Sequence, residues 1–193
     1  MKVGVLYSGG KDSSIMAVIL KRMGFTVELL TANFGVYDSY ISASKSAEAL
    51  NFPHNVLNLD KNILKKTVDI IVEDGFPNNG IKYIHSKAIE EIATIYPIIA
   101  DGSRRDDKTP KLDKDQIRSL EDRNNVQYIN LHGFGFRTIE TIASDLFEIS
   151  YEKSYKKSSS DYEVEIRSLI EEEGYLSKDF FPEHHQSRVI GFK

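Results

Sequence analysis

The chain has 193 residues, 40% of them hydrophobic and 28% charged, a length and composition that suit one compact domain with a sizeable core. Its 25 lysines and arginines against 29 aspartates and glutamates give a formal net charge of -4, which excludes a uniformly basic nucleic-acid coat. The absence of cysteine excludes disulfides, thiolate zinc sites, cysteine-held iron–sulfur clusters and a sulfur-carrying cysteine. No apolar run suits a membrane span, and a strand pattern follows Met1 directly, so we expect a soluble, cytoplasmic protein without a membrane partner.

Short apolar runs alternate with longer amphipathic segments along the chain, which is typical of βαβ units around a parallel sheet. The apolar runs predict five strands, at residues 3–7, 26–32, 54–59, 98–100 and 127–131. Apolar residues at helical spacing predict helices around residues 15–23, 39–50, 64–71, 81–95, 117–120, 139–146 and 166–170. The expected fold class is α/β, a doubly wound sheet of about five parallel strands with helices on both faces and a small C-terminal helical appendage.

A polar stretch rich in lysine and serine at residues 156–160 indicates a solvated connection late in the chain. It divides the sequence into a main domain at residues 1–155 and a helical extension and tail at residues 156–193, packed on the same domain. In doubly wound sheets, ligands bind beyond the carboxyl ends of the strands, where the strand order reverses. Glycine-rich or acidic loops follow the first, fourth and fifth predicted strands, so we expect the functional site there.

The segment Ser-Gly-Gly-Lys-Asp-Ser at residues 8–13 lies between the first predicted strand and the first predicted helix. Two glycines let the backbone turn tightly and approach a ligand, and the helix N-terminus offers N–H groups and a positive dipole end. Ser8 and Ser13 supply hydroxyl donors, Lys11 supplies a charge, and Asp12 can cap the helix or hold Mg²⁺. The segment lacks the spacing of a Walker A loop and of a dinucleotide fingerprint. It predicts a phosphate-binding loop, with a plain glycine turn and helix cap as the alternative.

This hexapeptide resembles the PP-loop, Ser-Gly-Gly-x-Asp-Ser, of the N-type ATP pyrophosphatase (adenine nucleotide alpha hydrolase-like) superfamily. The resemblance implies a HUP-type sheet, a main domain that binds ATP, and cleavage between the alpha and beta phosphates. In this superfamily a substrate oxygen attacks the alpha phosphate to give an adenylate and pyrophosphate, and a nucleophile such as ammonia or a sulfur donor then displaces AMP. The match covers the first βαβ unit well and extends to the loop after the fourth strand.

The segment Asp-Gly-Ser-Arg-Arg-Asp-Asp at residues 101–107 follows the fourth predicted strand, which we expect beside the first strand. Arg104 and Arg105 can neutralise charge that develops on phosphate oxygens, and Asp106 or Asp107 can coordinate Mg²⁺ or orient pyrophosphate. The superfamily is similar here in carrying a glycine and a polar residue followed by an acid, although the arginine pair departs from the commoner forms. The alternative is a solvated, self-neutralising charged turn.

Three further segments extend this prediction. The resemblance implies that Ala32, Asn33 and Phe34, at the end of the second strand, seat the adenine, with ordinary core packing as the alternative for Phe34. Residues 108–111 add positive charge, either as a lid over the phosphates or as a plain surface loop. Residues 133–138 either close the substrate side of the site or form a turn with buried aromatic side chains.

The histidines are weaker candidates. His184 and His185, followed by residues 186–188, could approach the site as a metal or phosphate contact, but adjacent histidines point in different directions and do not favour a shared metal. His85 and His132 are expected to be packed or partly exposed, and His132 is the better catalytic candidate because it ends a strand.

These segments favour an ATP pyrophosphatase that binds Mg²⁺ and ATP, adenylates a substrate oxygen, and releases pyrophosphate and then AMP. We expect catalytic roles for Lys11, Asp12, Arg104 and Arg105, and Mg²⁺ contacts from Asp12, Asp106 and Asp107. The predicted ATP-binding residues are Tyr7, Ser8, Gly9, Gly10, Lys11, Asp12, Ser13, Ala32, Asn33, Phe34, Gly102 and Ser103.

Two other functions stay open. One is a non-catalytic ATP- or AMP-binding regulatory module of the same fold, and the other is a tRNA-modifying adenylating enzyme. The absent cysteines and the acidic balance count against thiolation, although Lys156 and Lys157 could contact RNA. The acceptor is a small molecule or an RNA, a partner protein could donate ammonia or sulfur, and the chain could form a homodimer.

Overall fold

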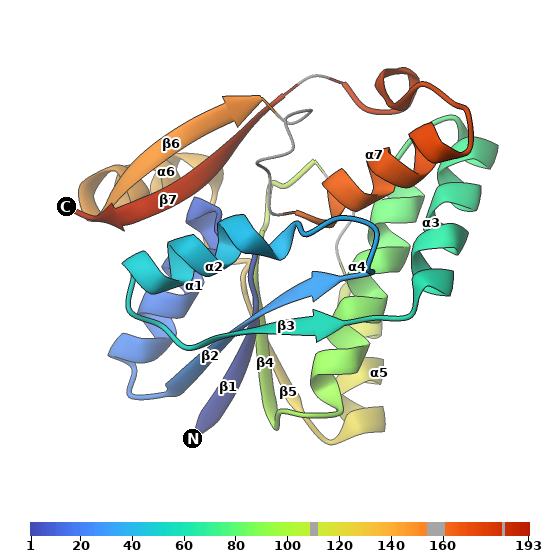
Figure 1. Ribbon diagram of the computed structural model, residues 1–193. Helices are drawn as coiled ribbons and strands as arrows, with labels where there is room; N and C mark the ends of the chain where they lie inside the picture. Colours follow the sequence, from blue (N-terminus) through green and yellow to red (C-terminus); the bar gives the residue numbers. More distant parts are fainter. Residues whose placement is uncertain (109–111, 154–160, 183) are drawn as a thin grey trace.

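A computed structural model describes residues 1–108, 112–153, 161–182 and 184–193, with a five-stranded sheet at its centre (Figure 1). The spatial order β3-β2-β1-β4-β5 reverses between β1 and β4, and every neighbouring pair is parallel. The predicted doubly wound α/β sheet is confirmed. The strands of this sheet are β1 (Lys2–Leu6), β2 (Thr26–Asn33), β3 (His54–Asn58), β4 (Ile98–Arg104) and β5 (Gln127–Leu131).

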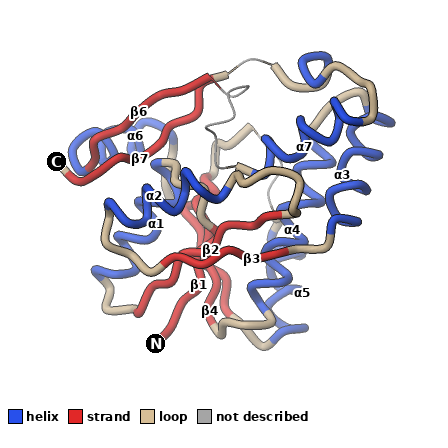
Figure 2. The backbone as a smooth tube through the Cα atoms, in the orientation of Figure 1, coloured by secondary structure: helices blue, strands red, loops and turns tan. Residues whose placement is uncertain are grey.

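Helices cover both faces of the sheet (Figure 2). The α-helices are α1 (Lys11–Arg22), α2 (Tyr40–Ala49), α3 (Lys61–Asp74), α4 (Asn78–Ala93), α5 (Lys114–Asn124), α6 (Phe136–Leu146) and α7 (Tyr162–Glu172). Val3 and Val5 of β1 belong to a core with α1, α2 and α6, whereas Leu6 and Leu30 belong to a second core with α3, α4, α5 and α7. Both faces of the central strands β1, β2 and β4 are therefore buried, as the continuous apolar runs predict. None of the described helices is long and apolar enough to cross a membrane.

Helix ends follow from local side-chain chemistry. The Asp60 side chain accepts a hydrogen bond from the Asn62 N–H at the start of α3, and Gly75, with φ 67°, ends that helix in the left-handed region. Asp113 and Gln116 form a reciprocal capping box at the start of α5. These signals fix both ends of α3, in the connection after β3, and the start of α5, in the connection before β5.

The last part of the chain is only partly the helical extension that the sequence predicts. The predicted helix is α7, and a short 3-10 helix, Ser177–Asp179, follows it. In addition, β6 (Phe147–Lys153) and β7 (His185–Phe192) pair as an antiparallel ribbon beside α6. This ribbon joins residues from both sides of the expected boundary, so the tail is strand as well as helix. The boundary itself and the predicted linker with Lys156 and Lys157 lie outside the described residues.

Candidate active site

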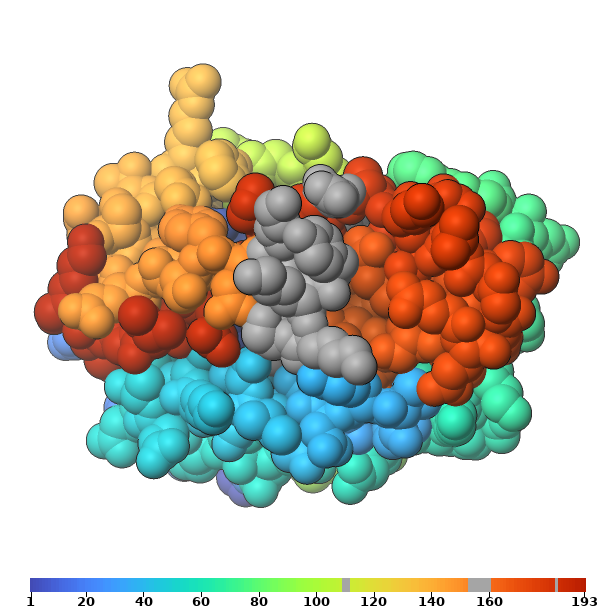
Figure 3. All heavy atoms as spheres, turned by 45° about the horizontal axis from the view of Figure 1, so that its top comes forward, coloured from blue at the N-terminus to red at the C-terminus, as the bar shows by residue number. Residues whose placement is uncertain are grey.

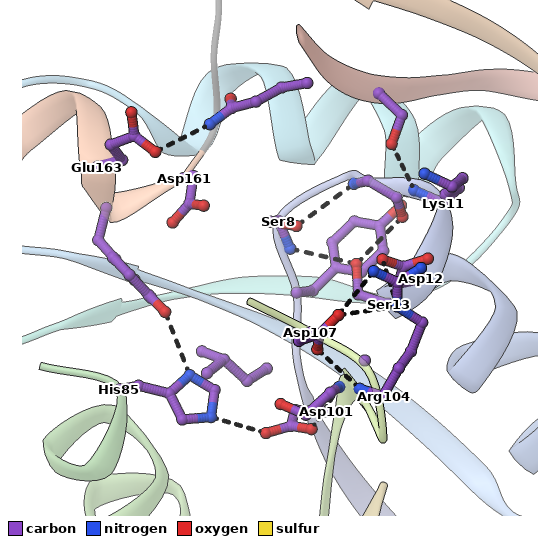
Figure 4. Close-up of a pocket in the computed structure, with 18 of the residues that line it drawn as sticks. Ser8, Lys11, Asp12, Ser13, His85, Asp101, Arg104, Asp107, Asp161 and Glu163 are labelled. Atoms are coloured by element: carbon purple, nitrogen blue, oxygen red, sulfur yellow. Dashed lines mark hydrogen bonds and ion pairs between the residues drawn. The ribbon is translucent and has the colours of Figure 1, made fainter. Parts of the chain in front are cut away.

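A cleft of about 700 Å³ opens at the carboxyl ends of β1 and β4, where the strand order reverses. Its lining comes from residues 8–13, the end of β4, α4, the start of α7, and β7. Figure 3 brings the top of the Figure 1 view forward and shows α7 on one side of this face and the ribbon of β6 and β7 on the other. Figure 4 shows how the labelled side chains gather around the cleft. The site thus combines the sheet with the tail.

The loop at residues 8–13 is shaped by its glycines and tied by its serines. Gly9 has φ 75°, in the left-handed region that favours glycine, and Gly10 is the N-cap of α1. The Ser8 Oγ accepts a hydrogen bond from the Gly10 N–H at 3.4 Å, and the Ser13 Oγ donates to the Gly10 carbonyl at 3.2 Å. The loop therefore turns the positive dipole end of α1 toward the cleft.

Asp12 is a carboxylate that makes no hydrogen bond with the described residues. Its Oδ1 is buried without a partner, and its Oδ2 lies 3.7 Å from the Arg104 Nε, an ion pair beyond hydrogen-bond distance. Burial raises the pKa of Asp12, whereas the charges of Lys11 and Arg104 lower it. A buried acceptor without a donor is costly, so the position suits a ligand that brings positive charge.

Arg104 is held among carboxylates at the end of β4. Its Nε donates to the Asp107 Oδ1 at 2.8 Å, its Nη2 lies 2.7 Å from the same oxygen, and its backbone N–H donates to the Asp107 Oδ2 at 2.8 Å. Its Nη1 is buried and has no hydrogen-bond partner in the described part of the chain. The guanidinium is thus fixed in direction by Asp107 and keeps donor capacity for an anion.

Arg105 and Asp106 do not take the places expected for them. Arg105 lies outside the cleft lining, and its Nη1 donates to the Gly133 carbonyl at 3.4 Å. Asp106 lines the cleft, but its Oδ2 accepts the Phe136 N–H at 2.7 Å and so caps the start of α6. The expectation that both arginines face the phosphates is therefore wrong for Arg105, because β4 ends at Arg104 and the backbone turns at residues 105 and 106.

Gly102 brings β4 against the first turn of α1. A Cβ atom at this position would lie 2.6 Å from the Ser13 N and 2.8 Å from the Asp12 carbonyl carbon, which is closer than such atoms approach. Only glycine allows this approach. The neighbouring Ser103 donates its N–H to the Asp101 Oδ1 at 2.8 Å. The close approach of Gly102 to the first turn of α1 sets the distance between Asp12 and Arg104.

Only one of the three residues predicted to seat adenine lines the cleft. Ala32 lines the cleft, but Asn33 and Phe34 do not. Asn33 shapes the next turn, since its Nδ2 donates to the Tyr37 carbonyl at 2.6 Å and its Oδ1 accepts the Gly35 N–H at 3.1 Å. The side chain of Phe34 is buried in the core, which is the packing alternative. The predicted set that lines the cleft is Tyr7, Ser8, Gly10, Lys11, Asp12, Ser13, Ala32, Gly102 and Ser103, whereas Gly9 lies outside the lining.

The ammonium of Lys11 is directed toward α6. Its Nζ lies 3.4 Å from the Glu140 Oε2 and 5.5 Å from the centre of the Phe136 ring. Phe136 lines the cleft, and it belongs to the predicted segment at residues 133–138. The other segment proposed as a lid falls partly at residues 109–111, which lie outside the described residues.

A buried network that the sequence did not predict lies under the cleft. The Asp101 Oδ2 is 2.8 Å from the His85 Nε2 and accepts the Tyr128 hydroxyl at 2.6 Å, while the His85 Nδ1 lies 3.2 Å from the Tyr162 hydroxyl. Burial alone would raise the pKa of Asp101 and lower that of His85, but their contact reverses both directions. His85 was expected to be packed, and it both packs and lines the cleft, whereas His132 is exposed outside it.

The tail supplies acidic and basic groups to the cleft. Its lining includes Asp161, Glu163, His184, His185 and the following residues 186–188. The His184 Nε2 lies 3.5 Å from the Glu163 Oε2, and the Glu163 Oε1 accepts from the Arg167 Nε at 2.8 Å. His184 and His185 thus line the cleft, an approach that the sequence left open, through contacts between residues far apart in sequence.

Mg²⁺ fits one of the three aspartates predicted to hold it. No three histidine, aspartate or glutamate side chains among the described residues are arranged to hold a metal by themselves. Asp107 is committed to Arg104 and Asp106 to α6, but Asp12 has a carboxylate oxygen without a partner. Mg²⁺ is commonly bound through one or two carboxylates together with substrate phosphates, so Asp12 suits that role.

The strand order β3-β2-β1-β4-β5 and the cleft at the switch point define a doubly wound α/β fold with a candidate ligand site beside the loop between β1 and α1. The U34-tRNA thiolase NcsA from Methanococcus maripaludis, solved with its 4Fe-4S cluster, shares the fold with a TM-score of 0.55 and 20% identity over 75% of this chain and 56% of that chain. At this identity the likeness concerns the fold alone.

The chain belongs to the family of unknown function DUF7411, whose model matches residues 1–191. It is 49% identical to the uncharacterized protein MJ0690 of Methanocaldococcus jannaschii, over 100% of this chain and 97% of that protein. A crystal structure described as a predicted subunit of tRNA methyltransferase, from Methanocaldococcus jannaschii, superposes with a TM-score of 0.95 and 48% identity, covering 100% of this chain and 98% of that chain.

Proposed function

We propose that the cleft binds ATP with Mg²⁺ and that the chain adenylates a substrate oxygen, releasing pyrophosphate and then AMP. The observation that carries this proposal is the pair Asp12 and Arg104, whose Oδ1 and Nη1 are buried without hydrogen-bond partners among the described residues. The two side chains face each other at the N-terminus of α1. Opposite charges left partly unpaired beside a helix N-terminus suit a phosphate chain that carries a cation.

Each residue has a definite part in this reaction. The loop at residues 8–13 holds the beta and gamma phosphates through backbone N–H groups and hydroxyls. Arg104 donates to the oxygens of the alpha phosphate, where negative charge grows as the substrate oxygen attacks and the bond to the bridging oxygen breaks. Asp107 keeps the Arg104 guanidinium in that direction. Mg²⁺, held by Asp12 and phosphate oxygens, would neutralise charge on the leaving pyrophosphate.

We further propose a tRNA as the acceptor. One structural relative supports this class by description, since the crystal structure that is 48% identical is described as a predicted subunit of tRNA methyltransferase. The present chain has no cysteine, so a cysteine-bound iron–sulfur cluster is excluded. If sulfur is transferred, its donor would therefore come from outside this chain.

Product analysis tests the proposal. Incubation with alpha-labelled ATP, Mg²⁺ and bulk tRNA should give AMP and pyrophosphate, and Asp12→Asn should reduce AMP release while the matched exposed variant Asp122→Asn on α5 should not. Thermal unfolding of both variants controls for loss of fold. Clean formation of ADP would overturn adenylation. ATP that stays bound and unchanged with every acceptor would instead identify a non-catalytic nucleotide-binding module.

A further inference from the structure

The strand β7 lies directly on the phosphate-binding loop. The Val189 N–H donates to the Gly9 carbonyl at 2.9 Å, and the Lys11 N–H donates to the Ser187 Oγ at 3.3 Å. A Cβ atom on Gly10 would lie 3.4 Å from the Ser187 carbonyl oxygen, so the strand and the loop are in van der Waals contact. The tail therefore covers the same backbone that the proposed function assigns to the phosphates.

The Ser187 hydroxyl keeps a donor after this contact. A hydroxyl has one donor and two acceptor positions, and here an acceptor position takes the Lys11 N–H. The hydrogen of the hydroxyl is thus available to an oxygen in the cleft, which Ser187 lines. The Ser187 hydroxyl therefore adds one hydrogen-bond donor to the N–H groups and hydroxyls at the start of α1.

Arg188, the next residue of β7, adds a cation to the cleft lining. Its Nη2 lies 2.9 Å from the Glu152 Oε1 on the paired strand β6, and its Nη1 lies 3.5 Å from the Ser42 Oγ on α2. Its Nε is buried without a hydrogen-bond partner in the described part of the chain. Nε and Nη2 form one edge of the guanidinium, and among the described residues only Nη2 has an acceptor.

We propose that Ser187 and Arg188 are polyphosphate-binding residues, and that Arg188 exchanges Glu152 for oxygens of the beta and gamma phosphates when ATP binds. The proposal rests on the proposed function and extends its site to the tail. A guanidinium edge matches two phosphate oxygens as well as it matches a carboxylate, so the exchange replaces one ion pair by another. Glu152 also lines the cleft, which places both partners of the pair beside the ligand.

The position of β7 favours pyrophosphate over the adenosine part of ATP. The strand contacts residues 9–11, whereas Ala32, the cleft-lining residue of the predicted adenine segment, lies at the end of β2. With Arg104, Arg188 gives the cleft lining two guanidinium groups for an anion of several negative charges. Loss of Arg188 should accordingly weaken binding of pyrophosphate and ATP and leave binding of AMP nearly unchanged.

Calorimetric titration with pyrophosphate, ATP and AMP tests this with the full chain. We expect Arg188→Gln to weaken pyrophosphate and ATP binding roughly 10- to 100-fold, the range for a charged hydrogen-bonded contact. Ser187→Ala should weaken both by about threefold, and Ser187→Thr, which keeps the hydroxyl, should restore them. Glu152→Gln is the matched control, because it removes the ion pair but leaves the guanidinium, and it should bind pyrophosphate at least as tightly as the wild type.

The outcomes separate the two proposals. If the wild type binds neither ATP nor pyrophosphate, the proposed function fails. If the wild type binds both and Arg188→Gln binds them equally well, the tail is not part of the site and the present inference is overturned. Equal losses in Arg188→Gln and Glu152→Gln would also overturn it, because the ion pair would then act only by holding β6 to β7.

Discussion

The two sides of the cleft are built differently. The sheet side consists of residues 8–13, which follow β1, and the end of β4; β1 and β4 are adjacent parallel strands and contribute to the core with α1, α2 and α6. The tail side consists of α7 and the ribbon of β6 and β7, which reach the cleft through contacts between distant parts of the chain. The sheet side presents Lys11 and Arg104, whereas the tail side presents Asp161 and Glu163 together with Arg188.

This difference separates the groups that suit phosphate from the groups that hold the site in place. Groups that suit phosphate lie mainly on the sheet side, where neighbouring strands hold them rigidly. On the tail side, the buried Glu165 of α7 accepts N–H hydrogen bonds from Phe34 and Val36 at 3.0 and 3.1 Å and so fixes the turn after β2. The tail therefore supports the sheet side as well as facing it, and substitutions on each side should change different measurements.

The largest effect is expected at Arg104. The proposed reaction develops charge beside the Arg104 guanidinium that Asp107 holds, so Arg104→Ala should lower kcat for AMP formation roughly 100- to 1000-fold with a smaller change in ATP affinity. Arg105→Ala is its matched control and should stay within about twofold of the wild type, since Arg105 lies outside the cleft lining. Equal losses in both variants would show that the segment acts as a whole and not through one guanidinium.

The next effect concerns the spacing on the sheet side. Gly102→Ala introduces a Cβ atom 2.6 Å from the Ser13 N, so β4 and α1 must separate. A displacement near 1 Å typically costs about 100-fold in turnover. Gly133→Ala, at a glycine with open space around its Cβ position, is the control in steady-state assays. Unchanged turnover in Gly102→Ala would show that the site tolerates this separation.

On the tail side, Glu165→Ala should act first on stability. Removal of the carboxylate leaves the N–H groups of Phe34, Val36 and Tyr37 without their acceptor, which should lower the free energy of unfolding by about 2 kcal/mol. Urea unfolding measures the change. The exposed Glu172 on the same helix provides the control substitution, Glu172→Ala. If the two variants unfold alike, the carboxylate does not hold the turn.

The smallest effect is a pH dependence on the tail side. Burial and the charge of Glu163 raise the pKa of Asp161 from 3.8 to about 6, with His85 and His184 acting in the opposite direction. The folded chain then holds this proton more tightly than the unfolded chain, so the wild type loses stability as the pH rises from about 4 to 6. Asp161→Asn removes that loss and should gain about 1 kcal/mol at pH 8 relative to pH 4. If the difference in stability between Asp161→Asn and the wild type is the same at the two pH values, the raised pKa of Asp161 is contradicted.

The sheet was predictable because its signals are local. Continuous apolar runs and helical spacing identify β1 to β5 and the helices between them. Residues 8–13 carry the pattern typical of a phosphate-binding loop within six consecutive positions. The ribbon was missed although Phe147, Ile149 and Tyr151 alternate with polar residues, because β6 follows α6 without a turn signal. A period of two over so few residues is a weak signal beside a helix that ends at Leu146.

The cleft lining was predictable where a residue directly follows or ends a predicted strand, as at Asp12 and Gly102. It was not predictable where the partner is remote. Phe34 is buried rather than part of the cleft, and its N–H bonds to Glu165, 131 residues away. Arg104 and Arg105 have the same chemistry in sequence, and only the direction of the backbone at the end of β4 separates them.

The contact between Lys11 and Ser187 joins residues 176 positions apart, and this separation orders events during synthesis. All five strands of the parallel sheet lie before residue 132, so the sheet can form on the ribosome while β7 is still untranslated. Contacts between distant residues form late because the intervening chain must first be ordered. A nascent chain with a finished sheet therefore still lacks the strand that covers its glycine loop, and that loop stays open to solvent until translation has passed residue 189.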